Sequence, residues 1–129
     1  MIIRTLRLSE RAKEQLIRLK RLTGFRNWNV LCRWALCTSL SDLSPVSQQK
    51  IITDSNVELS WAVLTGEWGE VYEQLLYERC ELEKVEPSPE GLHDLLVRHV
   101  HRGIGMLGAE TRDQGVNPLL QAALGDAIF

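Results

Sequence analysis

Three cysteines carry the most versatile side-chain chemistry in this chain, because a thiolate can bind a metal, attack a substrate or form a disulfide. They lie at Cys32, Cys37 and Cys80, a spacing that matches neither a zinc ribbon nor a CxxC redox pair. Cys32 and Cys37 fall within the apolar stretch WNVLCRWALCTSL, where burial raises a thiol pKa and makes the group inert. We therefore expect buried, free thiols rather than metal ligands or nucleophiles.

Histidines and glutamates give two further patterns that are suited to metal binding. His99 and His101 are two residues apart, so on a helix they point to different faces, and His93 does not complete a ligand set. The alternative for these histidines is a minor second phosphate contact with Arg98 and Arg102 near a helix C-terminus, which we do not favour. A second pattern is a cluster of glutamates near the start of a predicted helix, Glu67, Glu70 and Glu73. The helix dipole favours acidic side chains there, and no histidine lies at a spacing that would complete a metal site. We expect no metal site and no cofactor.

Catalysis is not expected either. The sequence contains no Ser/His/Asp, Cys/His or carboxylate and metal constellation at usable spacing. The three glycines at 103, 105 and 108 have the wrong spacing and context for a phosphate loop, so close helix packing or fraying explains them better.

Basic residues near the N-terminus indicate a different chemistry, the binding of anions. Residues 1–40 contain nine Lys and Arg against two Glu, a charge of +7, whereas residues 41–129 contain six against fifteen acids, a charge of −9. Such an asymmetry points to an anionic partner for the basic end, and nucleic acid is the commonest one in cytoplasm. The candidate DNA-binding residues are Arg4, Arg7, Arg11, Lys13, Arg18, Lys20, Arg21 and Arg26.

The elements that would position these cations can be predicted from periodicity. RTLRLS alternates as a strand does, and residues 9–23 form an amphipathic helix with Ser9 as N-cap and Gly24 just beyond its end. A second, more apolar helix begins near Asn27 or Asn29. The alternative to an anion-binding face is a solvated helix paired with acids of the same chain. We favour anion binding because like charges on adjacent turns repel by a few tenths of a kcal/mol per pair.

A strand, a basic helix, a glycine turn and an apolar helix resemble a ribbon-helix-helix unit, in which strands of two protomers pair and enter the major groove. In that arrangement Thr5 and Arg7 would face bases, and the second helix would approach a phosphate through its N-terminus. Ile3 on the same side and Trp28 at the turn depart from the pattern. Contact with the DNA backbone is therefore expected more than readout of bases.

The rest of the chain predicts a helical scaffold with at most one or two short strands. VELSWAVL favours a strand, and a helix follows from Glu67 with an inward face that comprises Trp68, Val71, Tyr72, Leu75, Leu76 and Cys80. EPSPEG is a break, with Ser88 as cap and Pro89 at the first position of the next helix. The apolar segment 118–129 predicts a short docked helix. The fold class is thus mainly α, with residues 1–129 as a single domain in which 1–40 are basic and 41–129 acidic.

No signal peptide or membrane-spanning run is evident, so we expect a cytoplasmic protein without a membrane partner. The apolar second helix suggests a homo-oligomer, and two or four weak faces on one body would bind DNA more tightly than one. A tetramer is among the expected assemblies.

Three segments resemble the DndE family of bacterial DNA sulfur modification proteins: IIRTLRLSERAKEQLIRLKRLTGFRNWNVLCRWAL, ELSWAVLTGEWGEVYEQLLYERC and LLVRHVHRGIGML. The resemblance implies a role in DNA phosphorothioation, in which sulfur replaces a non-bridging phosphate oxygen. It also implies partners, namely a cysteine desulfurase, an adenylating sulfurtransferase-like subunit and an ATPase subunit. DndE proteins resemble accessory DNA binders that form homo-oligomers, and no catalytic residue set carries over to this sequence.

The basic N-terminal face predicts that the chain grips the DNA backbone, and the resemblance implies that it does so as an accessory subunit of a phosphorothioation complex. Roughly six phosphate contacts would give a log-log salt slope near −5. The alternative is a ribbon-helix-helix transcriptional regulator, which would prefer one palindromic operator. Intact, nicked or otherwise interrupted duplex and single-stranded DNA all remain open as ligands.

Overall fold

The computed structural model describes residues 3–114, and the predicted helix at 118–129 lies outside them. The elements follow in the order β1 (Thr5–Arg7), α1 (Glu10–Thr23), α2 (Trp28–Ser41), β2 (Glu58–Ser60), α3 (Trp61–Thr65), a 3-10 turn η1 (Gly66–Trp68), α4 (Gly69–Glu83) and α5 (Pro89–Gln114). The prediction of a mainly α fold with one or two short strands is confirmed. No helix within the described part of the chain is long and apolar enough to cross a bilayer.

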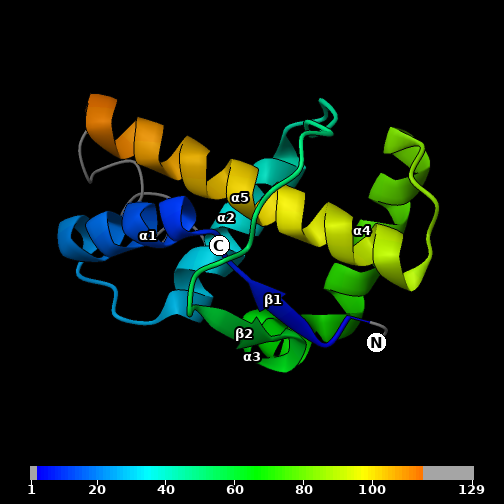
Figure 1. The fold of residues 1–129 in the computed structure, drawn as a ribbon, viewed down its shortest axis with the longest axis horizontal. Coiled ribbons are helices and arrows are strands. Elements are labelled where there is room, and N and C mark those ends of the chain that lie inside the picture. Colours follow the sequence, from blue (N-terminus) through cyan, green and yellow to red (C-terminus); the bar gives the residue numbers. More distant parts are fainter. Residues whose placement is uncertain (1–2, 115–129) are drawn as a thin grey trace, which may run out of the picture.

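The long helix α5 organises the fold. It crosses α2, lies beside α1 and contacts α4 near its own N-terminal end (Figure 1). Gly103 permits the crossing, because a Cβ atom at this position would lie 1.7 Å from the carbonyl oxygen of Ala35 on α2. Close helix packing therefore explains Gly103, whereas a Cβ at Gly105 or Gly108 would meet no atom within 4 Å.

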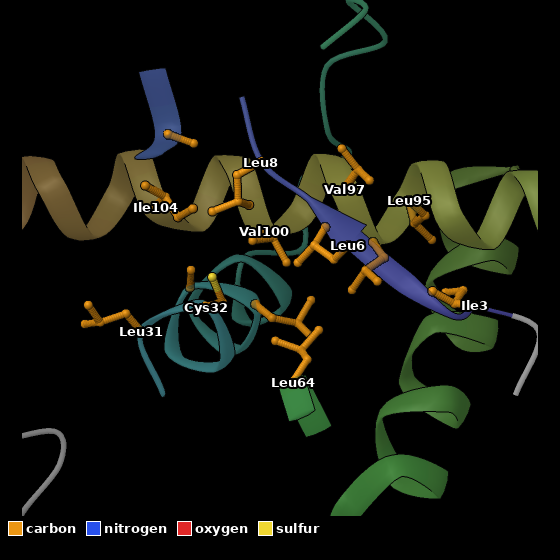
Figure 2. Close-up of a cluster of buried hydrophobic side chains, with 14 of the residues drawn as sticks. Ile3, Leu6, Leu8, Leu31, Cys32, Leu64, Leu95, Val97, Val100 and Ile104 are labelled. Atoms are coloured by element: carbon orange, nitrogen blue, oxygen red, sulfur yellow. The ribbon is translucent and has the colours of Figure 1, made fainter. Parts of the chain in front are cut away.

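The core fills the space between α5, α2 and β1. Leu6 and Leu8 lie between the two helices, close to Val100 of α5 and to Cys32 of α2 (Figure 2). Alternation along the strand explains this placement, since Leu6 and Leu8 are buried while Thr5 and Arg7 are exposed.

The two strands form an antiparallel pair within the chain, with Leu6 opposite Leu59 and Arg7 opposite Glu58. The strand predicted at VELSWAVL is thus present but covers only Glu58–Ser60. It ends there because helix α3 begins at Trp61, and the Ser60 side chain caps that helix. The predicted order of strand, helix, turn and helix at the N-terminus is also observed. One hydrogen-bonding edge of β1, however, is already occupied by β2, so a second protomer is not needed to pair with that edge.

Helix α4 differs most from the sequence-based expectation. Of the predicted inward residues, Leu76 and Cys80 are buried and Tyr72 is half-buried. Trp68, Val71 and Leu75 are exposed instead. The reason is that α4 is peripheral, and its packing against α5 covers only one narrow side of the helix (Figure 1).

Candidate nucleic-acid interface

Helix α1 carries most of the candidate cations, and both of its ends are fixed as the sequence predicts. The Ser9 hydroxyl oxygen accepts a hydrogen bond from the backbone N–H of Ala12 at 3.1 Å. Gly24 adopts the left-handed conformation with φ of 77°, and its N–H donates to the carbonyl of Lys20. The Ser9 N–H also donates to Nε2 of His101 at 3.1 Å, which joins the start of α1 to α5.

The cations of α1 lie along two different sides of the helix. Arg11 and Arg18 are seven residues apart, hence on one side, where both line a groove between α1 and α5 together with Gly108 and Thr111. The other side carries Lys13 and Lys20, which are also seven residues apart.

Both lysines make contacts within the chain. Nζ of Lys13 donates to the side-chain oxygen of Asn56 at 2.7 Å, and Nζ of Lys20 lies 4.1 Å from the ring centroid of Trp28. Lys13 therefore links the lysine side of α1 to the residues just before β2, and Lys20 links it to α2. The arginine side faces the groove between α1 and α5.

Five of the eight candidate residues have no partner among the described residues. Their side chains are exposed and make no hydrogen bond or ion pair in the part of the chain that the structure describes. They are Arg4, Arg11, Arg18, Arg21 and Arg26. Arg7 differs, because its guanidinium pairs with Glu58 and donates to the carbonyl oxygen of Ser55 at 2.8 Å.

The unpartnered arginines do not all share one surface. Arg4 lies beside Glu90 and His93 near the start of α5, whereas Arg18 lies beside Gly108 near its other end. Eighteen residues of α5 separate Glu90 from Gly108, about 27 Å at the rise of an α-helix. Arg4 is therefore remote from the arginine side of α1.

A second groove continues past the N-terminus of α1 and has a volume of about 550 Å³. Arg11 and Gln15 line both grooves, and Lys50, His101 and Gly105 line the second. Glu10 and Asp54 also border it, and Asp54 accepts the Glu10 backbone N–H at 3.1 Å. The mixed charge at this end makes the Arg11 to Arg18 stretch the more cationic part of the groove.

The arginines of the acidic part whose side chains the structure describes have structural roles instead. Arg79 donates to the carbonyl oxygens of Leu40, Asp42 and Ser44 at 3.0 to 3.2 Å. Arg102 donates to the Ser39 carbonyl at 2.9 Å and to the Ser44 carbonyl at 2.8 Å.

Arg98 completes this set by donating to the carbonyls of Ser47 and Gln49. These three side chains hold residues 42–50 against the helices. The minor phosphate contact at Arg98 and Arg102 was therefore a wrong interpretation, because backbone carbonyls already occupy both guanidinium groups.

A buried chain of polar groups underlies this loop. The Ser39 hydroxyl lies 2.7 Å from Nδ1 of His99, and Nε2 of His99 lies 2.7 Å from a carboxylate oxygen of Glu83. Arg102 Nε donates to the Ser39 oxygen at 2.8 Å, which leaves the Ser39 proton to bond His99. The order Ser, His, Glu resembles a catalytic triad, but all three side chains are buried and Ser39 is 0% exposed. These side chains link α2, α4 and α5 in the interior of the described fold.

Burial and hydrogen bonding set the ionisation of His99 and Glu83 within this group. Burial lowers the pKa of His99 below its usual value, and Arg79 and Arg102 add to this effect, while Glu83 opposes it. Burial also acts to raise the pKa of Glu83, but hydrogen bonds from Val46, His99 and Arg79 outweigh it and the pKa is lowered. A neutral His99 beside an ionised Glu83 is the resulting state.

The cysteines are free, as the sequence predicts, although Cys37 is exposed rather than buried. Burial raises the pKa of the Cys32 thiol to about 12, which makes it inert. No group of His, Cys, Asp or Glu side chains suited to a metal ion occurs among the described residues.

Comparisons with known proteins agree with the resemblance found in the sequence. The family model for DNA sulphur modification protein DndE matches residues 5–114. A crystal structure of DndE from Escherichia coli B7A, described as involved in DNA phosphorothioation modification, has a TM-score of 0.70 and 24% identity over 83% of this chain and 98% of that one. No curated protein sequence matches the chain.

A second crystal structure, of a DndE glycine-to-lysine mutant described as involved in DNA phosphorothioation, has a TM-score of 0.64 and 21% identity. It covers 82% of this chain and 99% of that one. Both similarities establish the fold, and the family match spans almost all the described residues. The chain belongs to the DndE family of DNA sulphur modification proteins.

Proposed function

We propose that this chain is a DNA-binding accessory subunit of a bacterial DNA phosphorothioation complex and that it holds the DNA backbone through the basic residues of its N-terminal part. It contributes no catalysis of its own and acts in the cytoplasm with the other subunits of the complex. The single observation that carries this proposal is the contrast between two sets of arginines.

In the described acidic part, Arg79, Arg98 and Arg102 are all bonded to backbone carbonyls. In α1, Arg11, Arg18 and Arg21 have no partner within the described chain, although fifteen of its seventeen acidic residues lie beyond residue 40. The chain therefore contains enough acidic residues to pair with these arginines, but no described carboxylate does so. An exposed arginine without a carboxylate partner is suited to a phosphate oxygen, which it binds bidentately.

The groove beside Arg11 and Arg18 supplies a place for the phosphate backbone. Its far wall includes Gly108, which has no side chain to exclude a ligand, and both arginines stand on the near wall. Arg21 and Arg26 extend the cationic surface toward the turn between α1 and α2. Lys13 and Lys20 are less available because Asn56 and Trp28 contact them.

Self-association would multiply these contacts. A homo-oligomer, including a tetramer, presents several copies of the arginine side of α1 on one body. Several weak contacts with the same DNA then give a higher total affinity than one contact does. Sedimentation of the full chain with and without duplex DNA tests this step.

Competition binding separates the proposal from a ribbon-helix-helix regulator. A labelled random duplex is titrated with the chain, and unlabelled random and palindromic duplexes compete in separate arms. Nicked and single-stranded forms of the random sequence compete in further arms. Sequence-independent competition supports the proposal. A preference of orders of magnitude for one palindromic duplex would overturn it in favour of a regulator. The pairing of Arg7 with Glu58 within the chain argues against a regulator, which would use this guanidinium to face a base.

A further inference from the structure

Helix α4 presents an apolar stripe that none of the described residues 3–114 covers. Trp68, directly before the helix, is 58% exposed, Val71 52%, Leu75 37% and Leu82 56%. These positions are separated by three, four and seven residues, which is the a and d spacing of a coiled-coil seam, with Glu78 at the remaining position. Side chains at this spacing lie on one side of the helix.

The stripe is not needed for the core of the chain itself. Leu76 and Cys80 are 0% and 1% exposed and supply the packing of α4 on the body of the protein. A monomeric soluble protein rarely leaves several large apolar side chains in line on one helix, and such a line typically marks an interaction site.

Acidic side chains lie in the stripe and beside it. Glu78 occupies one of its positions, Glu81 flanks it on the solvent side, and both are exposed. No cation within α4 is exposed. Its one arginine, Arg79, is 6% exposed and turned inward to carbonyl oxygens and Glu83. A partner that covers the stripe must therefore place positive charge beside these glutamates.

We propose that the α4 stripe, Trp68, Val71, Leu75 and Leu82, docks a basic amphipathic helix of a different polypeptide, one with apolar a and d positions flanked by Lys or Arg. This proposal does not depend on DNA binding by α1. It assigns the acidic part of the chain to protein partners and leaves the arginine side of α1 to DNA.

A second copy of the chain fits this stripe less well. Two α4 helices packed through this stripe would bury Glu78 of each copy in the seam and place Glu81 of each copy at its border, and no exposed cation within α4 would offset these charges. Helix α1 is basic, but Leu22 is the only large apolar side chain that is exposed on it, and all of α1 lies within the described residues. Helix α1 of a second copy therefore has no row of exposed apolar side chains that could pack against the four apolar residues of the α4 stripe.

The test uses two designed three-heptad peptides with Leu at a and d, one with Lys and the other with Glu at e and g. Each is labelled and titrated with the full chain by fluorescence anisotropy. The chain is compared with a stripe variant, Leu75→Ser with Leu82→Ser, and a matched control, Leu43→Ser with Ile52→Ser. The control removes two side chains that are 75% and 69% exposed outside α4.

We expect the Lys peptide to bind the wild type and the control alike, and to bind the stripe variant at least about tenfold more weakly. The Glu peptide should not bind. Equal affinity for the stripe variant, or equal binding of both peptides, would overturn the proposal.

Sedimentation of the same proteins without peptide tests whether a second copy of the chain occupies the stripe. If the wild type is an oligomer and the stripe variant alone dissociates, the stripe is occupied by another copy and the proposal is wrong. Equal mass of the two supports it. DNA affinity, measured on the same samples, should be unchanged by the stripe variant, so failure here is distinguishable from failure of the DNA-binding proposal.

Discussion

Nε2 of His99 lies 2.7 Å from the carboxylate of Glu83, and this pair connects α5 to α4 in the interior of the protein. His99 is 0% exposed, and its pKa is lowered mainly by burial. Burial therefore favours a neutral imidazole in the folded state, although Glu83 opposes this effect, and proton uptake by the imidazole opposes folding.

The stability of the fold should fall with acid in two stages. Below about pH 6.5 the unfolded chain binds protons that the folded His99 and His101 resist, so the free energy of unfolding decreases as pH falls. Below about pH 4.5 the stabilising ionised state of Glu83, whose folded pKa is lowered, is lost as well. Urea unfolding at a series of pH values measures both stages. His99→Gln should flatten the first stage, whereas a slope equal to that of wild type would contradict the assignment; His93→Gln, at an exposed site, is the control.

Two glycines on α5 should respond in opposite directions to the same substitution. Gly103→Ala places a Cβ 1.7 Å from the Ala35 carbonyl oxygen, which forces the backbones of α2 and α5 apart and should cost about 2 kcal/mol or more. Gly105→Ala meets no atom within 4 Å and should stabilise the helix by about 0.5–1 kcal/mol. Chemical denaturation of both variants gives the two values. Equal effects would mean that the crossing of α2 and α5 is not as close as described.

The ends of helices could be predicted from the sequence where the signals that set them are local. Ser9 and Gly24 bound α1 because a cap and a left-handed turn depend only on nearby backbone, and Ser88 with Pro89 begins α5 for the same reason. The excess of positive charge was likewise visible. The division into an arginine side and a lysine side follows from the spacing of seven residues and could have been predicted too.

Features that depend on distant partners could not be predicted. Arg102 bonds to backbone carbonyls about sixty residues away, and a carbonyl has no sequence signature. Both sides of α4 contain apolar residues, so only the position of α5 decides that Leu76 is buried and Leu75 is not.

The loop at residues 42–50 should loosen when its arginine anchors are shortened. Arg102→Lys keeps the charge but cannot reach the carbonyls of Ser39, Asp42 and Ser44 together. We expect faster amide hydrogen exchange confined to this loop and the end of α2, and a loss of stability of about 1–3 kcal/mol. Exchange measured by mass spectrometry locates the change. Arg18→Lys, at a residue without such contacts, should leave the loop protected, and equal exchange in both variants would exclude the anchoring role.

One of the three thiols should react in the native state. Cys37 is exposed, with its sulfur 3.4 Å from the Tyr72 hydroxyl, whereas Cys32 and Cys80 are buried and burial raises the pKa of both. Titration with an aromatic disulfide reagent should therefore release one equivalent rapidly, and three after unfolding in urea. Cys37→Ser should abolish the rapid release. Rapid release from that variant would show that a buried thiol is more accessible than its position implies.

Salt-dependent DNA binding tests the central claim most directly. Affinity for a random duplex is measured between low and physiological salt for three proteins: the wild type, the triple variant Arg11→Gln with Arg18→Gln and Arg21→Gln, and Lys84→Gln. The last variant removes an exposed cation at the residue that follows α4. Each lost phosphate contact should reduce the log-log slope by about 0.9, so the triple variant should lose between two and three units while Lys84→Gln remains close to wild type. Equal slopes for all three proteins would contradict the assignment of the α1 arginines to the DNA backbone.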